Sequence, residues 1–116
     1  MSIFSQIIAG TVPADVLWQD DLCIVIRDIH PQAPVHLLVI PKKPLRSLAD
    51  AQQEDQALLG NLMLIAADMA KQQGIEDGFR IIANNGKAVG QTVFHLHFHL
   101  LGGKRYREAN IHQDTV

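Results

Sequence analysis

Large apolar residues alternate with histidines from Phe94 to Leu101, in the order Phe-His-Leu-His-Phe-His-Leu-Leu. Because strand side chains point to alternate faces of a sheet, this period of two predicts a strand over Val93 to Leu101. One face of that strand would carry His95, His97 and His99. The other face would carry the apolar residues and pack into the core.

Four further apolar segments have the length and the flanking residues of strands. They span Val16 to Trp18, Leu22 to Arg27, Val35 to Ile40 and Phe79 to Ala83. The turn residues Gln19-Asp20-Asp21 separate the first two segments and predict an antiparallel hairpin. With the histidine strand, the chain is expected to form five strands.

The apolar pattern changes between Glu54 and Gln73, where a spacing of three and four residues predicts one long amphipathic helix. Gly74 follows where a left-handed cap is expected, and Lys71 offsets the negative end of the helix dipole. A short helix is predicted from Ser2 to Ile8. Five strands, one long helix and a short N-terminal helix place the chain in the α+β class.

Composition bounds the number of domains and the redox chemistry. The 116 residues, 47% of them hydrophobic, suit one globular domain over residues 1–116, with a polar tail from about residue 104. Cys23 is the single cysteine, so no internal disulfide can form, and its apolar neighbours predict a buried strand residue.

Charge and hydropathy exclude further classes. Ten basic and twelve acidic residues give a net charge of −2, which lacks the basic surface of a general nucleic-acid binder. A mononucleotide remains an open ligand, since it needs only local donors. No cationic leader and no membrane-length apolar segment is present, so we expect a cytoplasmic protein without membrane contact.

The histidine face admits three interpretations. Alternate strand histidines lie about 6.5 to 7 Å apart at Cα, which suits two ligands of one zinc ion but not three. In the second interpretation the middle imidazole attacks phosphorus while its neighbours hold protons or oxygens. The third is a polar outer face of a half-buried strand. The eight residues alone do not decide among them.

Three motifs in order resemble the histidine triad family. The histidines, followed by Leu100-Leu101-Gly102-Gly103, are similar to its pattern His-φ-His-φ-His-φ-φ, where φ is apolar. The segment from Asp28 to Lys43 resembles the ribose side of the Hint branch, and Arg80 to His95 resembles its phosphate loop. The resemblance covers roughly residues 2 to 103.

This resemblance implies a HIT-like α+β fold with a five-stranded antiparallel sheet, and a homodimer formed through the long helix and the fifth strand. It implies hydrolysis of purine nucleoside phosphoramidates, such as AMP linked to an amine, through a nucleotidyl-histidine. A nucleophilic imidazole requires no metal or cofactor. The alternatives are a non-catalytic nucleotide-binding or scaffolding module, a dinucleotide or nucleotide-sugar hydrolase of the same superfamily, and a zinc metallohydrolase. The zinc protein is disfavoured because no acidic ligands accompany the histidines.

The resemblance also implies roles for four histidines. His97 is the expected nucleophile, with its second nitrogen held by an acceptor such as a backbone carbonyl. His99 is expected to donate a proton to the leaving amine or to bind a phosphate oxygen. His95 would orient the nucleophile through its main chain, or serve only as a structural histidine. His36 would pack near the triad, where it could tune or orient His97.

Four residues are candidates for the nucleoside. Asp28 ends an apolar strand, where its carboxylate can accept hydrogen bonds from both ribose hydroxyls, or simply cap the loop. Phe4, Ile26 and Ile29 are candidates for an apolar slot around a purine base, and could equally be core.

The phosphate side is assigned to Asn84, Gly90, Gln91 and Thr92. Here the chain departs from the Hint pattern: its loop has one glycine fewer, and Thr92 replaces a serine. The tail lacks a tryptophan found in some Hint proteins. His30 and His112 match no motif and receive no role.

Overall fold

The structure, a computed structural model, describes residues 1–108, so His112 and the last part of the expected tail, residues 109–116, lie outside the described residues. The main elements are α1 (Ile3–Ile8), β1 (Val16–Gln19), β2 (Cys23–Arg27), β3 (Val35–Pro41), α2 (Gln56–Gln72), β4 (Phe79–Ile82) and β5 (Phe98–Gly102). Short 3₁₀ turns span Leu48–Asp50, Gln53–Asp55 and Lys87–Val89. Neither α-helix in this part of the chain is long and apolar enough to cross a membrane.

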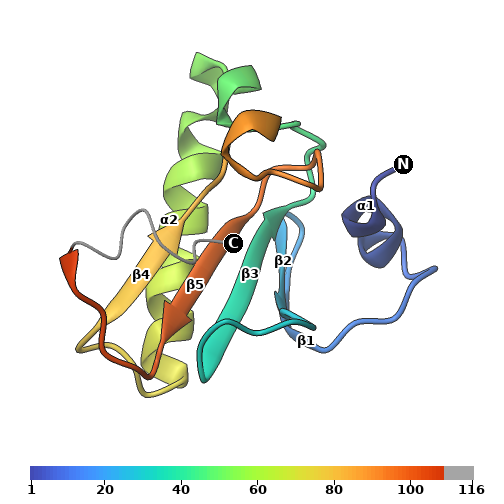
Figure 1. The fold of residues 1–116 in the computed structure, drawn as a ribbon. Helices are drawn as coiled ribbons and strands as arrows, with labels where there is room; N and C mark the ends of the chain where they lie inside the picture. Colours follow the sequence, from blue (N-terminus) through green and yellow to red (C-terminus); the bar gives the residue numbers. More distant parts are fainter. Residues whose placement is uncertain (109–116) are drawn as a thin grey trace.

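The strands form one antiparallel sheet in the order β1-β2-β3-β5-β4 (Figure 1). The sheet confirms the predicted five-stranded α+β fold. β5 lies between β3 and β4, where His99 pairs with Leu38 on one side and Ile82 on the other. The last triad histidine is therefore fixed in the middle of the sheet rather than at an edge.

The two faces of the sheet pack differently, with α2 and α1 on opposite sides (Figure 1). One face and α2 share a buried apolar core that includes Leu62, Met69 and Leu100. The other face has a smaller cluster, in which Phe4 of α1 packs with Leu38. Because residues alternate along each strand, His36 and His99 lie on this second face.

The fifth strand begins later than predicted. It starts at Phe98 instead of Val93, so His95 and His97 precede it. The backbone N–H of Leu96 donates to the Leu45 carbonyl at 2.7 Å, and no ladder pairing between strands is formed there. Leu96 and Phe98 still point into the core, as the alternation predicted.

Phe94 is the exception to the predicted alternation. Its side chain is 42% exposed, and the Arg46 guanidinium lies 5.4 Å from the ring centroid. The prediction that Phe94 is a core residue is wrong, because the segment leaves the sheet before reaching it.

The ends of the helices follow local sequence rules. Gly74 has φ +73°, the left-handed conformation expected just beyond α2. At the start of α1, the Ser2 hydroxyl accepts the backbone N–H of Ser5 at 3.0 Å and caps the helix. Cys23 is a buried free cysteine in β2, as predicted.

Candidate functional site

A cavity of about 430 Å³ lies between α1 and the open face of the sheet, a size within the range of small-molecule sites. Its polar wall includes His97, His99 and Asp28. Apolar side chains form much of the rest, namely Ile3, Phe4, Ile7, Val12, Ala14, Ile26, Ile29, Leu38 and Val93. The cavity can therefore hold a ligand with one flat apolar part and one polar part.

His97 has one nitrogen held and one available. Its Nδ1 lies 2.8 Å from the carbonyl oxygen of His95, and since a carbonyl only accepts, Nδ1 carries the proton. Burial lowers the pKa of His97 below its usual 6.5, so the ring is neutral at pH 7. The Nε2 lone pair of His97 is thus free to attack an electrophile in the cavity.

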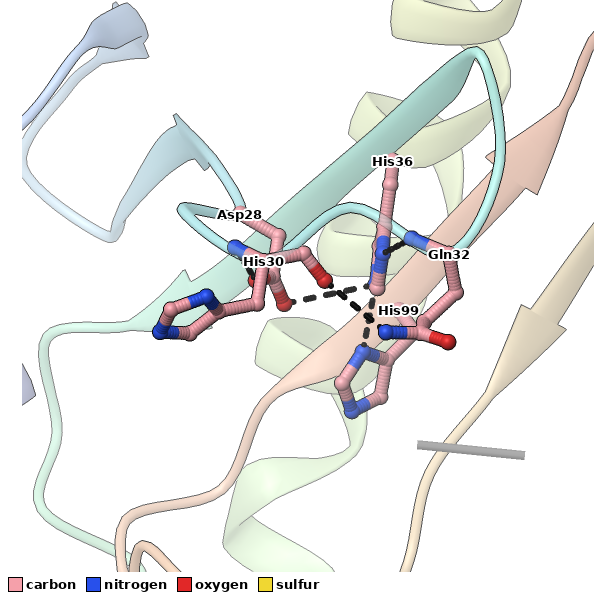
Figure 2. Close-up of polar contacts among 5 residues, drawn as sticks. All are labelled: Asp28, His30, Gln32, His36 and His99. Carbon is pink, nitrogen blue, oxygen red and sulfur yellow. Dashed lines mark hydrogen bonds and ion pairs between the residues drawn. The ribbon is translucent and has the colours of Figure 1, made fainter. Parts of the chain in front are cut away.

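His99 is linked to His36 through a chain of hydrogen bonds (Figure 2). The backbone N–H of Gln32 donates to His36 Nδ1 at 3.0 Å, so His36 carries its proton on Nε2. That Nε2–H lies 2.9 Å from His99 Nδ1 and donates to it. His99 in turn has its proton on Nε2, on the opposite side of its ring.

Burial, and to a smaller extent the neighbouring His97 and His36, lower the pKa of His99 to about 4, although the Asp28 carboxylate acts in the opposite direction. At pH 7 the substrate-free ring is neutral and offers one N–H donor. That donor suits an oxygen of a bound phosphate. To act as an acid toward a leaving group, His99 must gain a second proton, which a phosphate anion next to the ring favours.

Asp28 lies beside the same chain. Its Oδ1 accepts the backbone N–H of His30 at 2.8 Å, and its Oδ2 lies 3.4 Å from His36 Nε2 (Figure 2). Burial lowers the pKa of His36 more than the Asp28 carboxylate raises it. Asp28 lines the cavity, where its Oδ2 can accept hydrogen bonds from a ligand.

Asp28, His36 and His99 also meet the distance criterion for a metal site, with ligand atoms within 4.8 Å of one another. An acidic group therefore does accompany the histidines, contrary to the sequence-based expectation. The hydrogen bonds argue against a metal, because His36 Nε2 carries a proton while Nδ1 accepts the Gln32 N–H. A metal on Nε2 would require His36 to give up that backbone bond.

The predicted base slot is partly exposed. Phe4 and Ile26 are buried cavity residues, whereas Ile29 lines the cavity but is 84% exposed at its mouth. The Phe4 ring also meets the His97 ring edge-on, with centroids 4.9 Å apart. The apolar part of the cavity is thus continuous with the His97 imidazole.

On the predicted phosphate side, Asn84, Gly90 and Thr92 line the cavity. Gln91 does not; it is 3% exposed and braces the loop from inside. Its Oε1 accepts the backbone N–H of Gly86 at 2.8 Å, and its Nε2 donates to the carbonyls of Arg46 and Val93 at 2.7 and 3.0 Å. Gln91 can therefore shape the predicted phosphate loop without lining the cavity.

Several residues at the site carried no signal that the sequence analysis used. His30 and Gln32 line the cavity, and Ser5 lies 3.3 Å from His95 Nδ1. Leu38 could have been found, because it is two residues beyond His36 on the same face of β3. The spacing of three residues between Phe4 and Ile7 likewise places both on one side of α1.

Comparison with known sequences also identifies the histidine triad (HIT) family, over most of the chain. The model of the HIT domain family matches residues 9–106. An uncharacterized HIT-like protein of Synechocystis is 55% identical over 105 residues, covering 90% of this chain and 92% of the relative. An uncharacterized HIT-like protein of Chlamydia trachomatis is 52% identical over 102 residues, covering 88% and 92% of the two chains.

Solved structures have the same fold. A HIT family hydrolase from Legionella pneumophila is 38% identical, with a TM-score of 0.91 over 93% of this chain and 97% of that one. A histidine triad nucleotide-binding protein from Candida albicans is 27% identical, with a TM-score of 0.79 over 93% and 85% of the two chains. Sequence, fold and the clustered histidines agree, and the chain belongs to the HIT domain family.

Proposed function

We propose that this protein hydrolyses purine nucleoside phosphoramidates, such as AMP linked to an amine, through a nucleotidyl intermediate on His97. The observation that carries the proposal is the fixed tautomer of His97. With Nδ1–H bonded to the His95 carbonyl, Nε2 presents its lone pair to a cavity that can hold a nucleotide.

The reaction has two displacements at phosphorus. In the first, His97 Nε2 forms a bond to phosphorus as the P–N bond to the amine breaks. The positive charge that develops on the imidazole is stabilised by the His95 carbonyl, which accepts the Nδ1–H. In the second, water attacks phosphorus and gives its proton to His99, which lost one to the amine, while the bond to His97 Nε2 breaks and AMP leaves with the His97 ring restored to its neutral form.

The leaving amine must depart with an added proton, because an amide anion is a very poor leaving group. His99 is the proposed donor. Its neutral Nε2–H first binds a phosphate oxygen, and the negative charge of the substrate raises its affinity for a second proton. His36 fixes the neutral form of His99, because its Nε2–H donates to His99 Nδ1 and leaves the His99 proton on Nε2.

The ligand class rests on the shape and polarity of the cavity. Its apolar wall around Phe4 and Ile26 suits a purine ring, and the Asp28 carboxylate suits the ribose hydroxyls. Asn84, Gly90 and Thr92 are the proposed phosphate contacts. The structural relatives support hydrolysis and nucleotide binding, since one is a HIT family hydrolase and another a histidine triad nucleotide-binding protein.

We further infer a homodimer from the family resemblance. α2 has an exposed Leu64, 68% accessible, which a partner could cover. β5 is hydrogen-bonded to β3 and β4, so it can contribute only side chains or its end to a dimer interface. β4 is the edge strand next to β5 in the described sheet. Sedimentation equilibrium of wild type and Leu64→Glu tests this: the variant is expected to shift toward monomer.

The decisive test is turnover of a substrate panel by the purified protein, followed by ³¹P NMR. We expect adenosine 5′-phosphoramidate to give AMP and ammonia, with a guanosine analogue cleaved as well. AMP binding without turnover of any compound would instead indicate a non-catalytic nucleotide-binding module. Preferred cleavage of a dinucleoside polyphosphate would indicate a dinucleotide hydrolase.

A further inference from the structure

The imidazole of His95 is held at both nitrogens by groups from different parts of the chain. Its Nε2 lies 2.7 Å from the carbonyl of Pro41, at the end of β3, and therefore carries the proton. Its Nδ1 must then accept. The Ser5 and Ser2 hydroxyls of the α1 region lie 3.3 and 3.5 Å from that nitrogen.

The hydrogen bonds around the serines run in one direction. The backbone N–H of Ser5 donates to Ser2 Oγ at 3.0 Å, and Ser2 Oγ donates to Ser5 Oγ at 3.2 Å. The proton of Ser5 Oγ is then left for His95 Nδ1. The residue that caps α1 is thereby connected, through Ser5, to the first triad histidine.

His95 is also the residue whose carbonyl holds His97 Nδ1–H, at 2.8 Å. It lies before β5, where no strand ladder fixes its backbone. Its ring contacts and the adjacent bond from Leu96 N–H to the Leu45 carbonyl hold the peptide in place instead. Releasing the His95 ring would remove one of the restraints on the carbonyl that sets the tautomer of His97.

We propose that Ser5 is a positioning residue that couples α1 to the nucleophile, by locking the His95 ring and so the carbonyl that holds His97 Nδ1–H. The inference rests on the proposed function, because its kinetic consequence requires His97 to react. Ser5 touches neither the cavity nor His97, so it acts only through His95.

Through this coupling the short helix α1 has two roles: it lines the cavity and it positions His97. Its six residues are too few to form a stable isolated helix, so the helix depends on docking against the sheet. Phe4 lines the cavity and meets the His97 ring, while the next residue, Ser5, bonds His95. A docked α1 thus completes the nucleotide cavity and fixes the nucleophile together.

The kinetic experiment compares Ser5→Ala with wild type on adenosine 5′-phosphoramidate. Alanine preserves the helix and its Ser2 cap but removes the donor to His95. We expect kcat to fall on the order of tenfold, as for a small misplacement of a reacting group, with KM changed less than twofold. Ser5→Thr, which keeps a hydroxyl, should recover most of kcat. Gln6→Ala, at an α1 residue outside the cavity, is the matched control and should behave as wild type.

Nitrogen-15 NMR of the histidine rings gives a readout that does not depend on turnover. In wild type we expect His95 as the Nε2–H tautomer with a hydrogen-bonded Nδ1, and His97 as the Nδ1–H tautomer. In Ser5→Ala the His95 Nδ1 signal should shift toward that of an unbonded nitrogen, and His97 should become a mixture of tautomers. Gln6→Ala should leave all these signals in place.

The inference is overturned if Ser5→Ala keeps wild-type kcat, or if its His97 remains entirely the Nδ1–H tautomer. A fall in kcat that Ser5→Thr does not restore would also overturn it, since the hydroxyl would then not be the cause. If wild type cleaves no phosphoramidate, the proposed function fails, while the NMR comparison still decides whether Ser5 positions His97.

Discussion

The two faces of the sheet are built from the same strands but perform different tasks. The face against α2 is a continuous apolar core in which Leu62, Ala66 and Leu100 are fully buried. The face against α1 buries four histidines instead, each 9% exposed or less: His36, His95, His97 and His99. A 17-residue helix covers the first face, whereas a six-residue helix and a cavity cover the second.

The difference shows how stability and chemistry are separated within one strand. Leu100 and His99 are neighbours in sequence, yet one contributes to the core and the other to the cavity. Burying a neutral histidine requires a partner for each ring nitrogen that is not facing the ligand. The second face meets this requirement with backbone groups and with contacts between the histidines, so its polar network is fixed without filling the cavity.

The largest effect should come from removing His97, the proposed nucleophile on the second face. His97→Ala is expected to lower turnover of an adenosine phosphoramidate by at least about 10³-fold, because no other group forms the covalent intermediate. Calorimetry should show AMP binding within a few-fold of wild type, since the proposed base and ribose contacts lie on other elements. Substantial activity in the folded variant would contradict the assignment of His97.

The intermediate itself can be trapped to sharpen this result. Rapid quenching without acid, followed by mass spectrometry, should find the nucleotidyl group on His97. An adduct on His95 or His36 would move the nucleophile and overturn the mechanism.

The core face should respond in stability and not in chemistry. Leu100→Ala is expected to lower the free energy of unfolding by about 2 to 5 kcal/mol, because it leaves a cavity against α2. Leu22→Ala, at a 47% exposed position, is the matched control and should change stability by less than about 1 kcal/mol. Urea denaturation provides the measurement. A changed KM in folded Leu100→Ala would contradict this separation, because it would show that the core face also affects the chemistry.

Mild acid should lower the free energy of unfolding, because His99 on the second face is buried in its neutral form. The folded-state pKa of His99 is about 4 and its ordinary value is 6.5, so between these values the unfolded chain binds more protons. Stability is therefore fully present above pH 6.5 and declines as the pH falls toward 4, by at most about 3 kcal/mol from this residue. His99→Gln should flatten the dependence over this window in urea titrations. An equally steep decline in the variant would assign the effect elsewhere.

A smaller effect is expected for the ribose contact. Asp28→Ala should weaken AMP binding by about 1.5 to 3 kcal/mol, as for hydrogen bonds to a charged group. The 2′,3′-dideoxy nucleotide is the matched control: it should bind wild type weakly and lose little further affinity in the variant. Equal binding of AMP by both proteins would show that Asp28 does not hold the ribose.

Chelation should have no effect. His36 offers its Nδ1 to a backbone N–H and its Nε2–H to His99, so neither nitrogen is ready to bind a metal. Turnover is expected to survive exhaustive treatment with EDTA. A loss of activity restored only by zinc would favour a metallohydrolase and would require a different arrangement of the His36 chain.

The sequence by itself determined the features that depend on neighbours in the chain. Alternation along the histidine segment predicted that Leu96, Phe98 and Leu100 face the core, although it failed for Phe94, and Gly74 marked the end of α2. These follow from strand and helix periodicity and from the φ angle that glycine allows. The family motifs pointed to the same histidines and to Asp28, though their roles remain predictions.

Only the tertiary structure decided which groups meet across long separations. The His36–His99 bond joins residues 63 apart, and the Ser5–His95 bond joins residues 90 apart. The late start of β5 has the same origin, because Leu96 bonds to Leu45 instead of to a neighbouring strand. Periodicity selects the face on which a side chain lies, whereas strand register and loop path select its partner, and the partner fixes the tautomer on which the chemistry depends.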